Sequence, residues 1–338
     1  MSHSPAQVLA AAACHVPIAL VSTDDLGAIR ALAADLPAAF NWLGFECRLA
    51  RGDRRVDFGV CIDSRDRGRD TVATALAAGE ELPGLESLRP LLREWVDPSA
   101  QLHGLCPVLW AEWDRPAPGA VPFAFVCVDP GFPSDRPRPQ IAAARLRVAA
   151  ERCLELLRDR PPDLAALDKL DACARMLPAD AHILHLAPMP PGRGRGLRVH
   201  TSLRLPDVLP WLRGIEWPGD LDAARRALEL CYGAARVGVQ VTLSDRPHPY
   251  LGIEYYTRSD PRSNLEWSRV LAGLVTAGLC DATKAEAVLG WFGDETVDLP
   301  GAAWFVNIQR QFYVKLVVAQ GAFEAKVYLT LHPRFVPL

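Results

Sequence analysis

The feature that most limits how this chain can fold is a pair of strand-like runs that returns five times along it. The runs alternate apolar and polar residues, are rich in β-branched and aromatic residues, and are joined within each pair by a turn or a short connection. The five pairs cover Gly44–Asp63, Pro107–Asp129, His182–Arg204, Arg236–Thr257 and Tyr313–Leu331. The sequence therefore predicts five β-hairpins, which supply ten antiparallel strands.

Helical stretches separate the hairpins, and most of the gaps hold two of them. Apolar residues recur at helical spacing in Leu85–Val96, where Pro90 is expected to delay or kink the helix, and in Gln140–Arg160. Near the C-terminus, Asp281 is expected to cap a further helix.

This element order differs from a βαβ chain, in which single strands alternate with single helices. We expect an α+β fold, namely a ten-stranded antiparallel β-barrel built from ααββ repeats with the helices outside. The repeat runs through the whole chain, so we expect a single domain over residues 1–338.

Composition argues against several classes of protein. The 338 residues carry a formal net charge of −3, whereas a nucleic-acid-binding protein normally has a basic face, so we expect no nucleic-acid partner. No run of about 18 apolar residues occurs, so we expect no membrane span. The nine cysteines form no CxxC pair. A secretory signal would require a basic residue near its start, but no Lys or Arg precedes Arg30. A reduced, cytoplasmic protein is the simplest interpretation.

Polar side chains share one face of the later strands, because successive residues of a strand point to opposite sides of a sheet. Arg198, His200 and Ser202 alternate with apolar residues, and so do Glu254 and Tyr256. The last hairpin and the first add Tyr313, Lys315, Lys326, Tyr328, Glu46 and Arg48. If helices cover the apolar face, these residues line the lumen of the barrel. The alternative is an ordinary antiparallel sheet with one solvated side.

Two histidines lie close together in the third hairpin. His182 and His185 are three residues apart on a predicted strand, which places them on opposite faces of the sheet. A metal site shared by these two side chains is therefore not expected.

The ααββ order and the polar strand faces together resemble the ABBA-type aromatic prenyltransferases, which include dimethylallyltryptophan synthases and cyanobactin peptide prenyltransferases. Members of that family hold a prenyl diphosphate with Lys and Arg at alternating lumen positions, and interleaved tyrosines shield the allyl cation. Three stretches carry the resemblance here: Lys326-x-Tyr328, Tyr313-x-Lys315 and Arg198-x-His200-x-Ser202.

The resemblance implies transfer of a prenyl group from a prenyl diphosphate to an aromatic or peptide acceptor inside the barrel. Glu46 and Glu254 would be the catalytic carboxylates. The implied substrate-binding residues are Arg48, Arg198, His200, Tyr256, Tyr313, Lys315, Lys326 and Tyr328. No DDxxD motif is present, so the resemblance implies either no metal or a Mg²⁺ ion that assists the diphosphate.

These residue types suit the chemistry. Fixed cations stabilise the negative charge that develops on a departing diphosphate, and aromatic faces stabilise the allylic cation left behind. A carboxylate that accepts a proton from the acceptor makes the acceptor more nucleophilic.

A second class of function stays open, namely a non-catalytic barrel that binds a peptide or a small molecule. A diphosphate chamber should be net positive, whereas acidic candidates for the lumen nearly balance the basic ones. These acidic candidates are Glu46, Asp57, Glu112, Asp114 and Glu254. The charge that surrounds Lys315 and Lys326 in the folded protein would distinguish the two classes.

Overall fold

The fold is described from a computed structural model of the chain. The structure describes residues 3–117, 119–129, 140–158, 164–189, 196–231, 233–244, 247–256, 265–300, 305–319 and 322–335.

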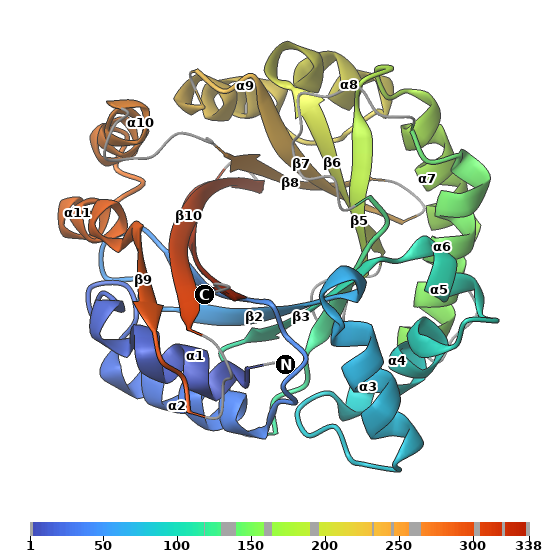
Figure 1. The fold of residues 1–338 in the computed structure, drawn as a ribbon. Coiled ribbons are helices and arrows are strands. Elements are labelled where there is room, and N and C mark those ends of the chain that lie inside the picture. The colour runs from blue at the N-terminus through green and yellow to red at the C-terminus, as the bar shows by residue number, and fades with distance from the viewer. Residues whose placement is uncertain are drawn as a thin grey trace.

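Ten antiparallel strands form a closed barrel, which confirms the predicted fold class (Figure 1). Neighbours in the ring are also neighbours in the chain, except where the last strand, β11, pairs with β1 as well as β10 and so closes the ring. The ring strands are β1 Trp42–Arg48, β2 Val56–Asp63, β3 Val108–Asp114, β4 Phe123–Cys127, β5 His182–Pro188, β6 Leu197–Arg204, β7 Arg236–Leu243, β8 Pro247–Tyr255, β10 Val306–Ala319 and β11 Ala322–Phe335. The first and last ring strands are partners, and we therefore propose that residues 1–338 fold as one domain.

The helices lie outside the ring and cover its outer face (Figure 1). They are α1 Pro5–Ala12, α2 Thr23–Asp35, α3 Gly68–Ala77, α4 Arg89–Val96, α5 Gln101–Leu105, α6 Ala143–Arg158, α7 Leu164–Arg175, α8 Val208–Gly214, α9 Leu221–Leu230, α10 Leu265–Thr276 and α11 Ala282–Trp291. Pro90 lies in the first turn of α4, where a proline costs no hydrogen bond, so it delays the helix and does not kink it. The side chain of Asp281 caps α11 as predicted, because it accepts a hydrogen bond from the Thr283 amide at 2.9 Å.

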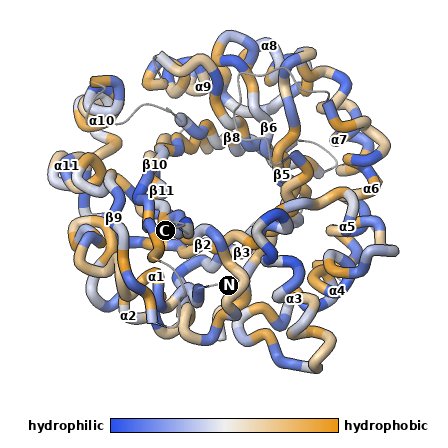
Figure 2. The backbone as a smooth tube through the Cα atoms, in the orientation of Figure 1, coloured by the Kyte–Doolittle hydropathy of each residue, from blue (hydrophilic) through white to orange (hydrophobic). Residues whose placement is uncertain are grey.

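Alternation along the strands separates an apolar outer face from a mixed inner face. In β1 and β2 the fully buried Phe45 and Phe58 point outward, and the ring of Phe45 packs edge-on against Trp291 of α11 at 6.3 Å between centroids. Figure 2 shows hydrophilic and hydrophobic residues interspersed along the strands of the ring. The inner face receives the polar residues, so the interpretation of these strands as one solvated side of an open sheet is wrong.

One strand was not predicted. The short β9, Gly293–Val297, pairs with residues 306–310 of β10 on the side where β8 would otherwise continue. Only residues 314–319 of β10 pair with β8. The barrel wall therefore has a less regular seam between β8 and the first half of β10.

The expectation for the two histidines of β5 is wrong. A bulge between Ile183 and His185 shifts the register, so that His182 pairs with Ser202 and His185 pairs with His200. Paired residues share a face, and Ser202 and His200 both face the lumen. Both β5 histidines therefore point inward, because one extra residue reverses the alternation.

Among the described residues, no helix is both long and apolar enough to cross a bilayer. All nine cysteines are free, and eight of them are buried. The cytoplasmic location predicted from them stays a prediction.

Candidate active site

A cavity of about 700 Å³ occupies the lumen. Its size is in the range of pockets that bind small organic ligands. Six of the ten predicted site residues line it: Glu46, His200, Glu254, Tyr256, Tyr313 and Tyr328.

The four predicted basic residues form a separate layer. Each lies two positions nearer the hairpin turn than a cavity-lining residue of its own strand: Arg48 after Glu46, Lys315 after Tyr313, Lys326 before Tyr328 and Arg198 before His200. Two positions along a strand is about 6.5 Å, so the cations lie deeper in the barrel than the cavity wall. The structure thus brings the ten residues into one lumen, in two adjacent layers.

Strand register explains why these residues meet. Lys326 is the cross-strand partner of Arg48 on β1 and of Lys315 on β10, and Lys315 is in turn the partner of Glu254 on β8. Tyr328 lies opposite Glu46 on one side and Tyr313 on the other. The last hairpin therefore places its two lysines between the two predicted carboxylates.

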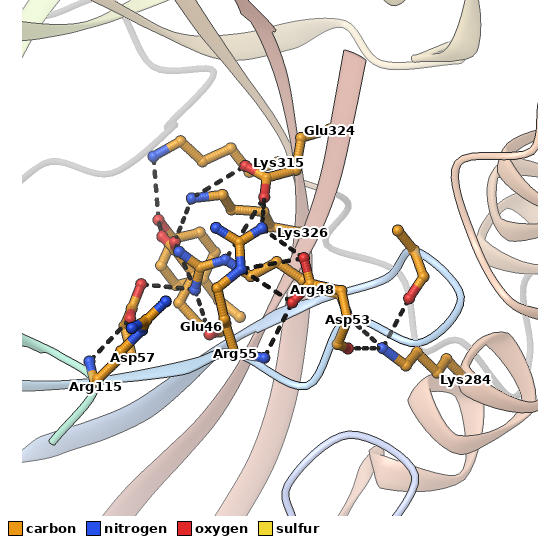
Figure 3. A network of polar contacts seen from close by, with 12 residues as sticks. Glu46, Arg48, Asp53, Arg55, Asp57, Arg115, Lys284, Lys315, Glu324 and Lys326 are labelled. Atoms are coloured by element: carbon orange, nitrogen blue, oxygen red, sulfur yellow. Dashed lines mark hydrogen bonds and ion pairs between the residues drawn. The ribbon is translucent and has the colours of Figure 1, made fainter. Parts of the chain in front are cut away.

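Both lysines of the last hairpin contact a carboxylate, and Figure 3 shows the contacts of Lys326 with Glu46 and Glu324. Lys326 Nζ donates to Glu46 Oε1 at 2.7 Å and lies 3.5 Å from Glu324 Oε2. Lys315, only 4% exposed, donates to the Tyr328 hydroxyl at 3.1 Å and lies 3.7 Å from Glu254 Oε1. Both lysines thus have polar partners supplied by the protein itself.

Arg48 is paired more firmly than either lysine. Its Nη1 lies 2.6 Å from Asp57 Oδ2 and 3.5 Å from Glu46 Oε1, and its Nε lies 3.7 Å from Glu324 Oε1. Arg55 also contacts Glu324, at 3.1 Å, which extends the network toward the β1–β2 turn (Figure 3).

The pKa values of the two predicted catalytic carboxylates are shifted in opposite directions. Burial disfavours the charge of Glu46, but Lys326, Lys315 and Arg48 together outweigh burial and lower its pKa. The Tyr328 hydroxyl also donates to Glu46 Oε2. Burial is the dominant cause at Glu254, with the charge of Glu46 adding to it and Lys315 opposing it, and the pKa of Glu254 rises to about 7.

Glu254 is also fixed in position by uncharged groups. Gln240 Nε2 donates to its Oε1 at 2.6 Å, and the Tyr256 hydroxyl donates to its Oε2. His200 Nε2 lies 3.3 Å from the same Oε2, and the His200 ring stacks on His185 at 5.2 Å. Burial is the main cause that lowers the pKa values of both histidines, which keeps them neutral at pH 7.

Arg198 differs from the other cations because, among the described residues, none of its contacts is with a carboxylate. Its Nε donates to Thr242 Oγ1 at 3.3 Å, and its guanidinium stacks on the Tyr250 ring at 4.3 Å. Burial would raise the pKa of Tyr250, but Lys315, Arg198 and Lys326 together lower it. The lowered pKa of Tyr250 therefore indicates a local region of positive potential.

Three tyrosines form a continuous aromatic wall between the cations and the cavity. Tyr313 stacks on Tyr328 with centroids 4.4 Å apart and planes at 12°, and it contacts Tyr256 at 4.9 Å. The three rings come from β10, from β11 and from the residue that follows β8, so only the folded barrel assembles them.

Several lumen residues were missed from the sequence. Trp42 and Trp110 meet edge to face at 4.3 Å in the wall of the cavity, and Gln240 and Tyr250 contact Glu254 and Arg198, respectively. Each lies on the polar face of its strand, so alternation could have found all four. Trp42 and Trp110 are large and apolar, a residue type that more often fills a core than lines a polar lumen.

Comparison with known proteins identifies the fold. No protein-family model matches the chain, and no curated protein matches it either. Among solved structures, the chain is similar to a 6-dimethylallyl tryptophan synthase (TM-score 0.53, 14% identity, 97% of this chain and 96% of that one). A 6-dimethylallyltryptophan synthase from Micromonospora olivasterospora, in complex with DMASPP and Trp, gives a TM-score of 0.52, 16% identity and coverage of 98% and 97%. AnaPT from Neosartorya fischeri gives 0.53, 11% identity and coverage of 97% and 92%.

Proposed function

We propose that this chain, which has the ABBA prenyltransferase fold over nearly its whole length, transfers a prenyl group from a prenyl diphosphate to an aromatic acceptor in the lumen. The acceptor ring is free or carried by a peptide. The observation that carries the proposal is the group of three cations around Tyr250, placed next to a tyrosine wall and a carboxylate with a pKa of about 7.

The diphosphate binds near Tyr250, between Lys315 and Arg198. Within the described residues these lumen cations contact carboxylates least, because Lys315 has one carboxylate neighbour, at 3.7 Å, and Arg198 stacks on a ring. Fixed cations in a partly dry chamber stabilise the negative charge that forms when the bond between the prenyl carbon and the diphosphate oxygen breaks. Lys326 and Arg48 hold the carboxylate side of the network in place.

The prenyl group lies against the rings of Tyr256, Tyr313 and Tyr328. Their faces stabilise an allylic cation through cation–π attraction and keep water from reaching it. The raised pKa values of Tyr313 and Tyr328, caused first by burial and then by the nearby carboxylates, keep both hydroxyls protonated.

Glu254 accepts the proton that the acceptor ring loses when the new bond forms. A base with a pKa near 7 is ionised enough to accept a proton and basic enough to hold it. Glu46 fits this step less well, because its ion pair with Lys326 lowers its pKa. The catalytic role predicted for Glu46 stays a prediction.

A divalent metal ion fits this lumen poorly. Carboxylate oxygens of Glu46, Asp57 and Glu112 lie within 4.8 Å of one another, as a metal site requires. Arg48 and Lys326 already pair with two of these carboxylates, and an ion would have to displace them. We therefore propose that lysine and arginine side chains neutralise the diphosphate without Mg²⁺ bound to this carboxylate group.

One observation favours the second class of function, a barrel that binds a small molecule or peptide without catalysis. Lys326, Arg48 and Lys315 all contact carboxylates of the protein, so the lumen is close to neutral before any ligand enters. A ligand without a diphosphate would fit such a lumen as well.

Mass spectrometry distinguishes the two functions. The protein is incubated with dimethylallyl or geranyl diphosphate and with aromatic amino acids and peptides, and acceptors are searched for the added prenyl mass. We expect a prenylated acceptor with the wild type and almost none with Glu254→Gln. Tight binding of an aromatic ligand, with no product and no diphosphate binding measurable by calorimetry, would instead establish the non-catalytic barrel.

A further inference from the structure

A second pocket, of about 280 Å³, lies outside the barrel. Its polar lining consists of Ser64, just after β2, Arg69 of α3, His103 of α5 and Arg145 of α6. Ser64 directly follows Asp63, which lines the lumen cavity. The pocket therefore adjoins the rim of the barrel at the end opposite the hairpin turns, with a strand end between it and the lumen.

The pocket is positively charged, because its described lining contains two arginines and no acidic side chain. Within the described part of the chain, neither Arg69 nor Arg145 forms an ion pair, whereas Arg147, two residues after Arg145 on α6, contacts three carboxylates. Burial is the main cause that lowers the pKa of Arg69. The charges of Asp70 and Asp63 oppose this shift without forming an ion pair with Arg69, and an anion bound beside this partly buried cation would stabilise it further.

Arg69 is fixed by several contacts and still has N–H donors that these contacts do not use. Its guanidinium lies 4.6 Å from the centre of the Trp95 ring, and its Nη2 donates to the Cys106 carbonyl at 2.8 Å. Its Nη1 lies 3.4 Å from Nε2 of His103. Since His103 Nδ1 lies 3.2 Å from the Trp95 carbonyl, which can only accept, Nε2 is the acceptor for Arg69.

The remaining hydrogen-bond capacity points to an oxyanion. A guanidinium has five N–H donors, and Arg69 uses two of them in these contacts. Its Nε is buried and has no partner among the described residues. Arg145 donates to the Gly104 carbonyl at 3.1 Å and adds a second guanidinium group to the same pocket.

Both arginines contact carbonyls at the end of α5, and anchoring this short helix explains part of their placement. It does not explain why two guanidinium groups converge on one pocket whose described lining has no acidic side chain. Two guanidinium forks with a serine hydroxyl match the oxygens of a phosphate group.

We propose that the pocket formed by Ser64, Arg69, His103 and Arg145 binds a phosphate-type oxyanion outside the barrel. The site is independent of the lumen and of prenyl transfer, because its residues and the lumen cations belong to different elements.

The test is isothermal titration of the full chain with sodium phosphate and, separately, with methyl phosphate, at constant ionic strength. We expect one saturable site outside the lumen, weakened about tenfold or more by Arg145→Gln or by Arg69→Gln. Equal affinity for the two probes indicates a site open to phosphate esters, and preference for sodium phosphate indicates a site for the free ion. Arg69→Lys keeps the charge but loses the fork, and should also weaken binding.

Two variants serve as controls. Arg93→Gln removes an exposed arginine of α4 and the same unit of charge, and it should leave phosphate binding unchanged. Lys315→Met alters the lumen only and should leave the site outside the barrel intact, whether or not the protein is a prenyltransferase. Absence of saturable binding to the wild type, or binding that Arg145→Gln leaves unchanged and Lys315→Met removes, would overturn the proposal.

Discussion

Lys326 Nζ lies 2.7 Å from Glu46 Oε1, across the seam where the last strand of the chain closes the barrel against the first. The pair is buried, with side-chain exposures of 12% and 5%. Burying either charge alone would be costly, so the contact stabilises the closure of the ring as well as the charge of the lumen.

Removing the lysine from this pair should destabilise the fold. Lys326→Met leaves the Glu46 carboxylate buried with weaker partners, and we expect a loss of about 3 kcal/mol in the free energy of unfolding at pH 8. Urea denaturation measures it. Lys169→Met, at an exposed pair 3.8 Å from Glu216, should change stability by less than about 0.5 kcal/mol.

The loss of stability caused by Lys326→Met should depend on pH and on the presence of Glu46. The folded-state pKa of Glu46 is lowered, so its ion pair adds stability above the unfolded pKa and loses it as pH falls. The penalty of Lys326→Met should therefore shrink in acid. The double variant Lys326→Met/Glu46→Gln should recover part of the loss, and strictly additive losses would contradict the pairing.

Glu254 should control the pH dependence of prenyl transfer. The base is active when ionised, so kcat should rise with pH through the pKa of about 7 and then level off. Glu254→Gln should lower kcat by about 100-fold or more and abolish this rise. Gln240→Leu removes a neighbour that donates to Glu254 at 2.6 Å, and it should shift the pH profile upward while keeping a measurable kcat.

Binding of the diphosphate should take up a proton at Glu254. Lys315 lies 3.7 Å from Glu254 and lowers its pKa, and a diphosphate at Lys315 would cancel this effect. Calorimetry of pyrophosphate binding near pH 7.5, in two buffers of different ionisation enthalpy, measures the uptake. Affinity should increase as pH falls from 8 to 6. An equal uptake by Glu254→Gln would show that the proton goes to the ligand itself.

Lys284 should hold the β1–β2 turn in place. It is 6% exposed, and its Nζ donates to the carbonyls of Arg48 at 2.7 Å, Ala50 at 3.0 Å and Asp53 (Figure 3). Lys284→Met leaves three carbonyls without this donor, and we expect a loss of about 2–3 kcal/mol in stability and faster amide exchange in residues 49–55. Glu286→Gln, exposed on the same helix, is the matched control and should change neither.

Gly238 should be required for the contacts that position Glu254 and set its pKa. A Cβ at this position would lie 2.4 Å from His200 Nε2 and 3.1 Å from the Tyr256 ring, the two groups that contact Glu254 Oε2. Gly238→Ala should therefore destabilise the protein and alter the pH profile of kcat. Gly290→Ala, in α11 with no atom within 4 Å of the added carbon, should instead stabilise by about 0.5–1 kcal/mol. Similar effects of the two variants would contradict this account.

Much of the fold could be predicted from the sequence because its signals are local. Turn residues and period-two alternation located each ring strand, although β10 begins at Val306, seven residues before the predicted start at Tyr313, and showed which side chains share a face with Lys315 and Lys326. The same local rule failed at His182 and His185, because a single bulged residue reverses it. It also missed β9, a five-residue strand of mixed polar residues that forms only because the first half of β10 has a free edge.

The sequence by itself determined that two lysines and several carboxylates lie on the polar faces of predicted strands. Only the tertiary structure decided which of them meet. Glu46 and Lys326 are 280 residues apart, and their contact depends on the register in which β11 closes against β1. The opposite pKa shifts of Glu46 and Glu254 likewise depend on distances between strands and on burial in a shared lumen. These are properties of the closed ring, since a charge is stabilised or opposed by whatever lies within a few ångströms, however distant that neighbour is along the chain.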